Sequence, residues 1–168
     1  HRWRIEHLGA ATRAQLDRAA RLGLYLSMSP FQTYFWGDLL DGQIFDHEQG
    51  SRWQPTGDAL ATGACVSLHN DGPVSPPSPL VNIQTVLTRR TRAGNVHGAE
   101  QAIPLDAALR AQTIDAARTL RRDHLVGSIE VGKLADFVEL SGDPYAVDPA
   151  QLASAVEVKG TWLGGERI

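Results

Sequence analysis

Three short apolar runs, each followed by a segment with helical spacing, constrain the fold of this chain most strongly. The runs cover residues 3–6, 24–28 and 64–68. A helix between two such strands returns the chain to the same end of the sheet, so the strands run parallel. The sequence therefore predicts an α/β fold built around a parallel sheet.

Start and stop signals place the helices. Thr12 and Gln15 form the T-x-x-Q pattern of a capping box, and Gly23 is the residue type that most easily closes a helix in the left-handed conformation. Ser78 and Pro79 form a typical cap and first-turn pair. Two further helices are expected over residues 53–62 and 105–120.

Metal-capable side chains stand at the ends of two apolar runs. His7 follows the first run, and Asp71 follows the third. In a (β/α)₈ barrel the reacting groups lie where strands give way to loops, so these two side chains can meet over the barrel mouth. A complete barrel takes about 250 residues, and this chain has 168. We therefore expect about three βα units of a larger barrel.

Residues 29–51 combine glycines and a proline with many aromatic rings. A long aromatic loop after a barrel strand is a candidate substrate wall or lid. Trp36 is the residue that we take as a candidate for substrate binding in this loop. The alternative is that the rings only pack the loop onto the barrel.

The end of the chain has a different pattern. Residues 127–140 alternate and bend at glycines, as short antiparallel strands do, and residues 156–162 resemble a strand entering a hairpin whose return is cut off. We expect the barrel portion to occupy residues 1–125 and strands of a small β module to occupy residues 126–168. Asp136 is expected to serve that module structurally.

Composition argues against several classes of function. A net charge of −3 and a pI near 6.1 leave no basic surface for nucleic acid, and the basic residues within 89–92 are expected at a solvated helix end. No run approaches the 18 apolar residues of a membrane span, so no membrane partner is expected. The single cysteine, Cys65, is expected to be buried and favours the cytosol. The remaining histidines outside the two motifs are expected to face solvent: His1, His47, His97 and His124.

Three runs carry a resemblance to a known family. They are residues 4–7, residues 69–74 and the glycine-punctuated residues 127–137. Together they resemble the C-terminal part of metal-dependent hydrolases of the amidohydrolase superfamily. The nearest branch is the amidohydrolase-3 group, which includes N-substituted formamide deformylases. The resemblance covers essentially the whole chain.

The resemblance implies the last three strands of a TIM-type barrel, together with the C-terminal share of a small β-sandwich. It also implies one or two divalent metals, usually zinc, in the intact enzyme. His7 matches the metal-binding histidine after strand six. Asp71 matches the aspartate after strand eight, which contacts metal and handles protons. The family's other metal ligands have no counterpart here, so the isolated chain is expected to lack metal and to be inactive.

The implied reaction is hydrolysis of a C–N bond in an amide-like or formamide-like small molecule, with Asp71 as the catalytic residue. His69 and Asn70 are candidate substrate-binding residues. For His69 two alternatives stay open, an interaction that orients Asp71 and a local hydrogen bond to the loop. His7 and Asp71 also have structural alternatives, a hydrogen-bonded histidine at a strand end and a simple Asp-Gly turn.

Two other functions remain open at this point. The chain can be a catalytically silent fragment or structural half, since it starts without Met or a signal-like segment, or it can belong to a deaminase-type member of the same superfamily. Three parallel strands cut from a closed barrel leave two open edges. We therefore expect association, either with the N-terminal half of the same barrel or as a homo-oligomer.

Overall fold

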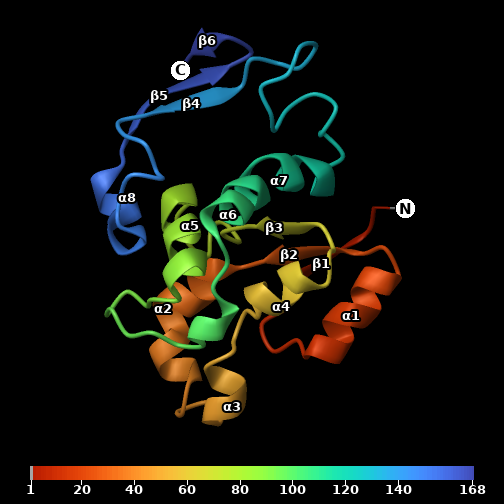
Figure 1. The fold of residues 1–168 in the computed structure, drawn as a ribbon, viewed down its shortest axis with the longest axis vertical. Coiled ribbons are helices and arrows are strands. Elements are labelled where there is room, and N and C mark those ends of the chain that lie inside the picture. Colours follow the sequence, from red (N-terminus) through yellow and green to blue (C-terminus); the bar gives the residue numbers. More distant parts are fainter. Residues whose placement is uncertain (1) are drawn as a thin grey trace.

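A three-stranded parallel sheet lies at the centre of the structure (Figure 1). The computed structural model describes residues 2–168. Strands β1 (Arg4–His7), β2 (Tyr25–Met28) and β3 (Val66–Leu68) stand in the order β1-β2-β3. The register pairs His7 with Met28 and Met28 with Leu68, so all three strands end at the same level. The predicted parallel sheet is confirmed.

Helices α1 (Arg13–Arg21) and α4 (Thr56–Ala61) pack against each other beside the sheet (Figure 1). The capping box is present, because the Gln15 N–H donates to Thr12 Oγ1 at 3.3 Å and the Thr12 N–H donates to Gln15 Oε1 at 2.8 Å. Helix α4 is shorter than predicted. Gln54 has a φ of 59°, which a right-handed helix cannot include, so the helix begins only after it.

The prediction of a long loop over residues 29–51 is wrong. This segment forms helix α2 (Pro30–Leu40) and the short helix α3 (His47–Gly50). Pro30 occupies the first position of α2, where its missing N–H costs no hydrogen bond. Apolar side chains lie on all sides of α2, so the sequence shows no helical period to reveal it.

Helix α5 (Pro79–Thr88) starts where predicted, although Ser78 makes no side-chain cap. The predicted helix over 105–120 is two helices, α6 (Leu105–Gln112) and α7 (Ile114–Thr119), because Thr113 has the non-helical angles φ −124° and ψ −99°. A 3₁₀ turn, η1 (Ala99–Gln101), precedes them. The core between the first sheet and these helices includes Leu26, Met28, Leu68, Ile83, Val86 and Ala108.

The end of the chain forms a second, antiparallel sheet at the top of Figure 1. It contains β4 (Phe137–Leu140), β5 (Val158–Leu163) and β6 (Glu166–Arg167), with η2 (Pro149–Gln151) and α8 (Leu152–Ala155) between the first two strands. The hairpin is complete, which corrects the expected missing return, and residues 127–136 contain no strand. Asp136 accepts a hydrogen bond from the Gly164 N–H at 2.7 Å, as a structural role predicts. The domain boundary near 125 and the β-sandwich stay predictions.

The helices are short. The longest in the described part of the chain, α2, has 11 residues, whereas a bilayer-spanning helix takes about 20. None of the helices in residues 2–168 combines the length and the apolar character that a membrane span requires.

Arg89 overturns the prediction that the basic residues after α5 are all solvated. It adopts a left-handed φ of 56° and is 1% exposed. Its guanidinium donates to the carbonyl oxygens of Trp53 at 2.7 Å, Gln54 at 3.0 Å and Ser51 at 3.3 Å, and its Nε donates to that of His97 at 3.1 Å. Burial lowers the pKa of Arg89 to about 10, so it stays charged at neutral pH. One buried cation therefore holds the segment before α4 and the loop after α5 together.

Cys65 is less buried than the sequence predicts. It is half-buried, and its Sγ lies 3.6 Å from the carbonyl oxygen of Asp115. Burial raises the pKa of the thiol to about 11, so the thiolate that would react is scarce at neutral pH. Cys65 is a packing residue.

Replacing Arg89 with Met should lower the free energy of unfolding by about 3 kcal/mol, because buried carbonyl oxygens lose their donor. The matched control is Arg90→Met, which removes an exposed arginine and should change the value by less than about 0.5 kcal/mol. Urea denaturation followed by circular dichroism measures both. Equal stabilities for the two variants would contradict the role given to Arg89.

Candidate active site

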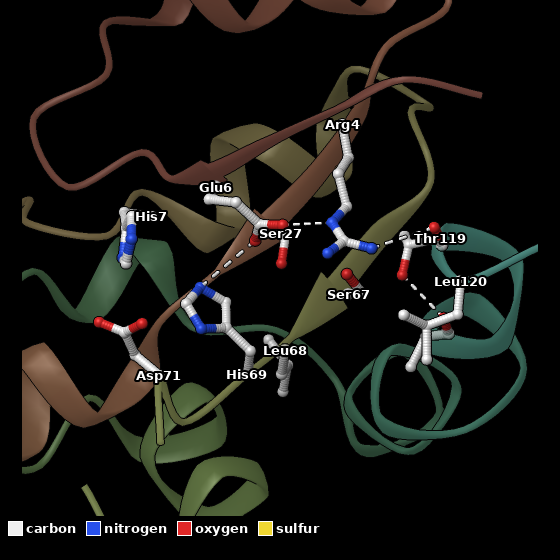
Figure 2. A pocket seen from close by; sticks show the side chains of 11 residues that line it. Arg4, Glu6, His7, Ser27, Ser67, Leu68, His69, Asp71, Thr119 and Leu120 are labelled. Carbon is white, nitrogen blue, oxygen red and sulfur yellow. Dashed lines mark hydrogen bonds and ion pairs between the residues drawn. The ribbon is translucent and has the colours of Figure 1, made fainter. Parts of the chain in front are cut away.

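A cavity of about 430 Å³ opens at the carboxyl ends of the parallel strands. Its lining includes His7 from the end of β1, and His69 and Asp71 directly after β3. Figure 2 shows these three side chains at one side of the cavity. The register of the sheet explains the arrangement, because strands that end at one level deliver their following residues to one edge. The structure thus brings together three of the five predicted site residues.

The backbone at these strand ends is strained. His7 has a φ of 70°, Leu8 a φ of 60° and Asp71 a φ of 50°, a region that non-glycine residues rarely enter. Such conformations concentrate at functional sites, where the surrounding structure maintains the strain. Both candidate metal ligands therefore carry a local signature of function that the sequence pattern does not reveal.

Ser29, which follows β2 directly, connects two of the rings. Its Oγ lies 3.2 Å from Nδ1 of His7 and 3.1 Å from Nε2 of His69. The two rings meet edge to face with centroids 5.1 Å apart. Ser29 is fully buried, and its backbone N–H donates to Gln54 Oε1 at 2.9 Å. One buried hydroxyl therefore fixes both imidazoles.

Hydrogen bonds connect Ser29 to the buried Arg89. Gln54 Nε2 donates to Gln32 Oε1 at 3.1 Å, and Trp53 Nε1 donates to the same oxygen at 2.7 Å. Arg89 in turn binds the carbonyl oxygens of Trp53 and Gln54. A polar network thus runs from α2 and the segment before α4 to the site. No sequence motif marks Ser29; its position immediately after the second apolar run is the signal that could have found it.

Glu6 and Arg4 are further lining residues that the sequence did not predict as site residues. They form an ion pair with each other, and Glu6 Oε2 lies 3.7 Å from Nε2 of His69. Burial raises the pKa of the Glu6 carboxyl, but hydrogen bonds from Ser27 and Arg4 outweigh it, so the pKa lies below its usual value. Burial also lowers the pKa of His69 despite the attraction of Glu6. A charged Glu6 therefore faces a neutral His69 at neutral pH.

The other two predicted substrate residues lie elsewhere. Asn70 turns away from this cavity: its Nδ2 donates to Asn82 Oδ1 at 3.2 Å, and its Oδ1 accepts from Asn82 Nδ2 at 2.8 Å. It borders a second cavity instead. Trp36 lines neither cavity and packs edge to face on Phe31, with ring centroids 5.5 Å apart. A role for Trp36 in substrate binding has no geometric support at this site.

His97 corrects the expectation of a solvent-facing ring. Its side chain is 15% exposed, with Nδ1 2.6 Å from Asp41 and Nε2 2.7 Å from Asp38. Burial lowers the pKa of His97, but the hydrogen bonds to the two carboxylates outweigh it and raise the pKa above its usual value. His47 and His124 are exposed as expected, and His1 lies outside the described residues.

The donor types in the cavity suit a zinc ion, which binds imidazole nitrogen and carboxylate oxygen. No hydrogen bond within residues 2–168 occupies Nε2 of His7, since the Ser29 contact is made through Nδ1. However, no group of three or more His, Cys, Asp or Glu side chains in the described part of the chain is arranged to hold a metal. The chain therefore offers part of a ligand set.

Comparison with known proteins decides the family. The whole chain, residues 1–168, matches the Amidohydrolase family of the amidohydrolase-3 type. The chain belongs to the amidohydrolase family. It is 32% identical over 162 residues to the N-substituted formamide deformylase of Arthrobacter pascens, an alignment that covers 96% of this chain and 30% of that protein. The predicted family is thereby confirmed.

Solved structures of the same architecture confirm the α/β fold. A metal-dependent hydrolase of Pyrococcus horikoshii matches with a TM-score of 0.73 and 24% identity, over 89% of this chain and 30% of that one. A zinc-bound adenosine deaminase of Xanthomonas campestris matches with a TM-score of 0.69 and 22% identity, over 98% of this chain and 36% of that one. The chain spans about 30% of the length of the curated relatives it matches.

The Ser29 bridge makes a prediction about the His7 ring. Serine has one hydroxyl hydrogen, so it can donate to only one of the two rings and must accept from the other. We expect His7 Nδ1–H to donate to Ser29 and Ser29 to donate to His69, which leaves the lone pair of His7 Nε2 open to the cavity. Long-range ¹⁵N–¹H NMR at mildly alkaline pH assigns both tautomers.

Ser29→Ala should remove the preference of His7 for this tautomer and lower the free energy of unfolding by about 1 kcal/mol. Ser67→Ala is the matched control, because Ser67 is buried in the lining of the same cavity without contacting either ring. A His7 ring protonated on Nε2 in the unsubstituted chain would refute the assignment.

Proposed function

We propose that the protein to which this chain belongs is a metal-dependent hydrolase that cleaves the C–N bond of an amide-like or formamide-like small molecule. The observation that carries the proposal is the convergence of His7, His69 and Asp71 on one cavity at the carboxyl edge of the sheet. Family membership and the formamide deformylase relative support this reaction class.

The residues of this chain would act in the following roles. His7, through Nε2, and Asp71, through a carboxylate oxygen, would be ligands of a divalent metal, with zinc suited to both donors. When bound, such a metal lowers the pKa of water from about 15.7 to about 7 and polarises a carbonyl group. Asp71 would accept the proton of the attacking water and return it to the nitrogen as the C–N bond breaks, giving a carboxylic acid and an amine.

His69 and Glu6 would assist from the side of the cavity. A neutral His69 can donate a hydrogen bond to a substrate carbonyl or orient Asp71. Glu6 Oε2 lies 3.7 Å from Nε2 of that ring and lines the same cavity. Arg4 Nη1 in turn donates to the carbonyl oxygen of Thr119 at 3.2 Å, which ties this wall of the cavity to the end of α7.

We also propose that the remaining metal ligands come from the rest of the same polypeptide. Within residues 2–168 the ligand set is incomplete, and β1 and β3 each pair on only one side in the described sheet. The open edges fit the missing barrel strands, and a second copy of the chain is the alternative occupant. The chain alone is then catalytically silent, while the whole polypeptide is a hydrolase. The hydrolase hypothesis and the fragment hypothesis are therefore compatible.

The test uses the full-length protein loaded with zinc and a panel of N-substituted formamides and amides, with amine release as the readout. Asp71→Asn should lower kcat by about 10²- to 10⁴-fold, the usual contribution of a general acid–base residue. Asp17→Asn, an equal change on the outer face of α1, should leave kcat unaltered. A parallel assay for ammonia distinguishes a deaminase.

Zinc content measured on the same samples separates loss of metal from loss of proton transfer. Full activity in Asp71→Asn, or no hydrolysis of any C–N bond by the zinc-loaded protein, would overturn the proposal.

A further inference from the structure

A second cavity, of about 500 Å³, lies next to the site. It is bordered by Asn70, the residue between His69 and Asp71, and by the first turns of α2, which begin two residues after β2 ends. Both features stand at the carboxyl edge of the sheet that also delivers His7. A molecule that reacts at Asp71 could therefore extend into this cavity.

One wall of the second cavity is aromatic. Phe31, Tyr34 and Phe35 line it from positions i, i+3 and i+4 of α2, which share one face of a helix. The rings of Tyr34 and Phe35 meet edge to face at a centroid distance of 4.9 Å, and Phe35 is 41% exposed. Val81 and the ring of Pro76 add further apolar surface to the lining of this cavity. Such a wall suits a flat or branched apolar group.

The same cavity carries one cation, Arg92. It is exposed, and within residues 2–168 its guanidinium forms neither an ion pair nor a hydrogen bond. Its backbone N–H donates to the carbonyl oxygen of Tyr34 at 2.7 Å, which fixes the arginine to the aromatic wall. An arginine fork is suited to bind a carboxylate.

A clamp holds the loop that bears Arg92 against α2. Asp38 accepts from Thr91 Oγ1 at 2.9 Å and from Asn95 Nδ2 at 3.0 Å, on either side of Arg92. His97 bridges Asp38 and Asp41 at the end of the same loop. The cation is thus presented from a fixed backbone, which lowers the entropic cost of binding an anion.

We propose that this second cavity is a substrate subsite for a group that combines an aromatic or branched apolar side chain with a carboxylate, and that Arg92 binds the carboxylate. The proposal rests on the proposed function for its substrate role and narrows the substrate to amides of acidic, apolar-substituted amines. Specificity of this kind comes from one charge and one apolar wall placed at a fixed spacing.

Binding of two matched probes tests the proposal without turnover. The probes are 3-phenylpropionate and its neutral isostere 3-phenylpropanamide, titrated by calorimetry into the full-length zinc-loaded protein. The acid should bind about fivefold more tightly than the amide, as expected for a partly solvent-exposed charge pair. Because the readout needs no catalysis, a protein that fails to hydrolyse any amide still answers this question.

Substitutions at Arg92 and Phe35 separate the contribution of the charge from that of the ring. Arg92→Gln should abolish the preference for the acid, while Arg21→Gln, the same charge change at the exposed end of α1, should preserve it. Phe35→Ala should weaken both probes by a similar factor. Each variant is compared with the parent protein by circular dichroism, and Arg92→Lys, which keeps the charge, should retain part of the preference.

Three results would overturn the inference. They are equal affinities of the parent protein for acid and amide, an acid preference that persists in Arg92→Gln, and absence of binding by either probe. The second result would place the carboxylate elsewhere, for example on the metal.

Discussion

The alignment of three short parallel strands is the constraint on which the site depends. His7, Met28 and Leu68 stand side by side in the register, so the chain leaves all three strands at one level. Leu8, Ser29 and His69 are the next residues, and Asp71 follows two positions later. A shift of one residue in any strand would turn its following side chain to the other face. The chemistry proposed for this edge is therefore a consequence of register.

A second requirement is that the loops after the strands remain fixed. The buried guanidinium of Arg89 connects the segment before α4 to the loop after α5. It donates to the carbonyl oxygen of Gln54, whose side chain in turn accepts a hydrogen bond from the backbone N–H of Ser29. Ser29 then holds both imidazoles. This continuous set of hydrogen bonds explains how strained residues such as His7 keep a conformation that would otherwise be unfavourable. The same hydrogen bonds give the buried charge of Arg89 a structural purpose.

The sequence predicted the features that rest on local chemistry. The capping box of α1, the parallel strands and the placement of His7 and Asp71 at strand ends all follow from short patterns. Helix α2 was missed, because Pro30 starts it without a side-chain cap and its apolar residues show no period. Arg89 and His97 were misjudged, since their burial depends on partners 35 to 59 residues away in sequence. Ser29 carries no motif, and its role exists only in the folded site.

The most direct test of the account is the position of zinc in the full-length protein. A crystal structure with anomalous scattering at the zinc edge should place the ion about 2.0–2.1 Å from a ring nitrogen of His7 and about 2.0–2.2 Å from a carboxylate oxygen of Asp71. The remaining ligands should come from residues outside this chain. A zinc ion that has neither His7 nor Asp71 as a ligand would contradict the proposed metal site.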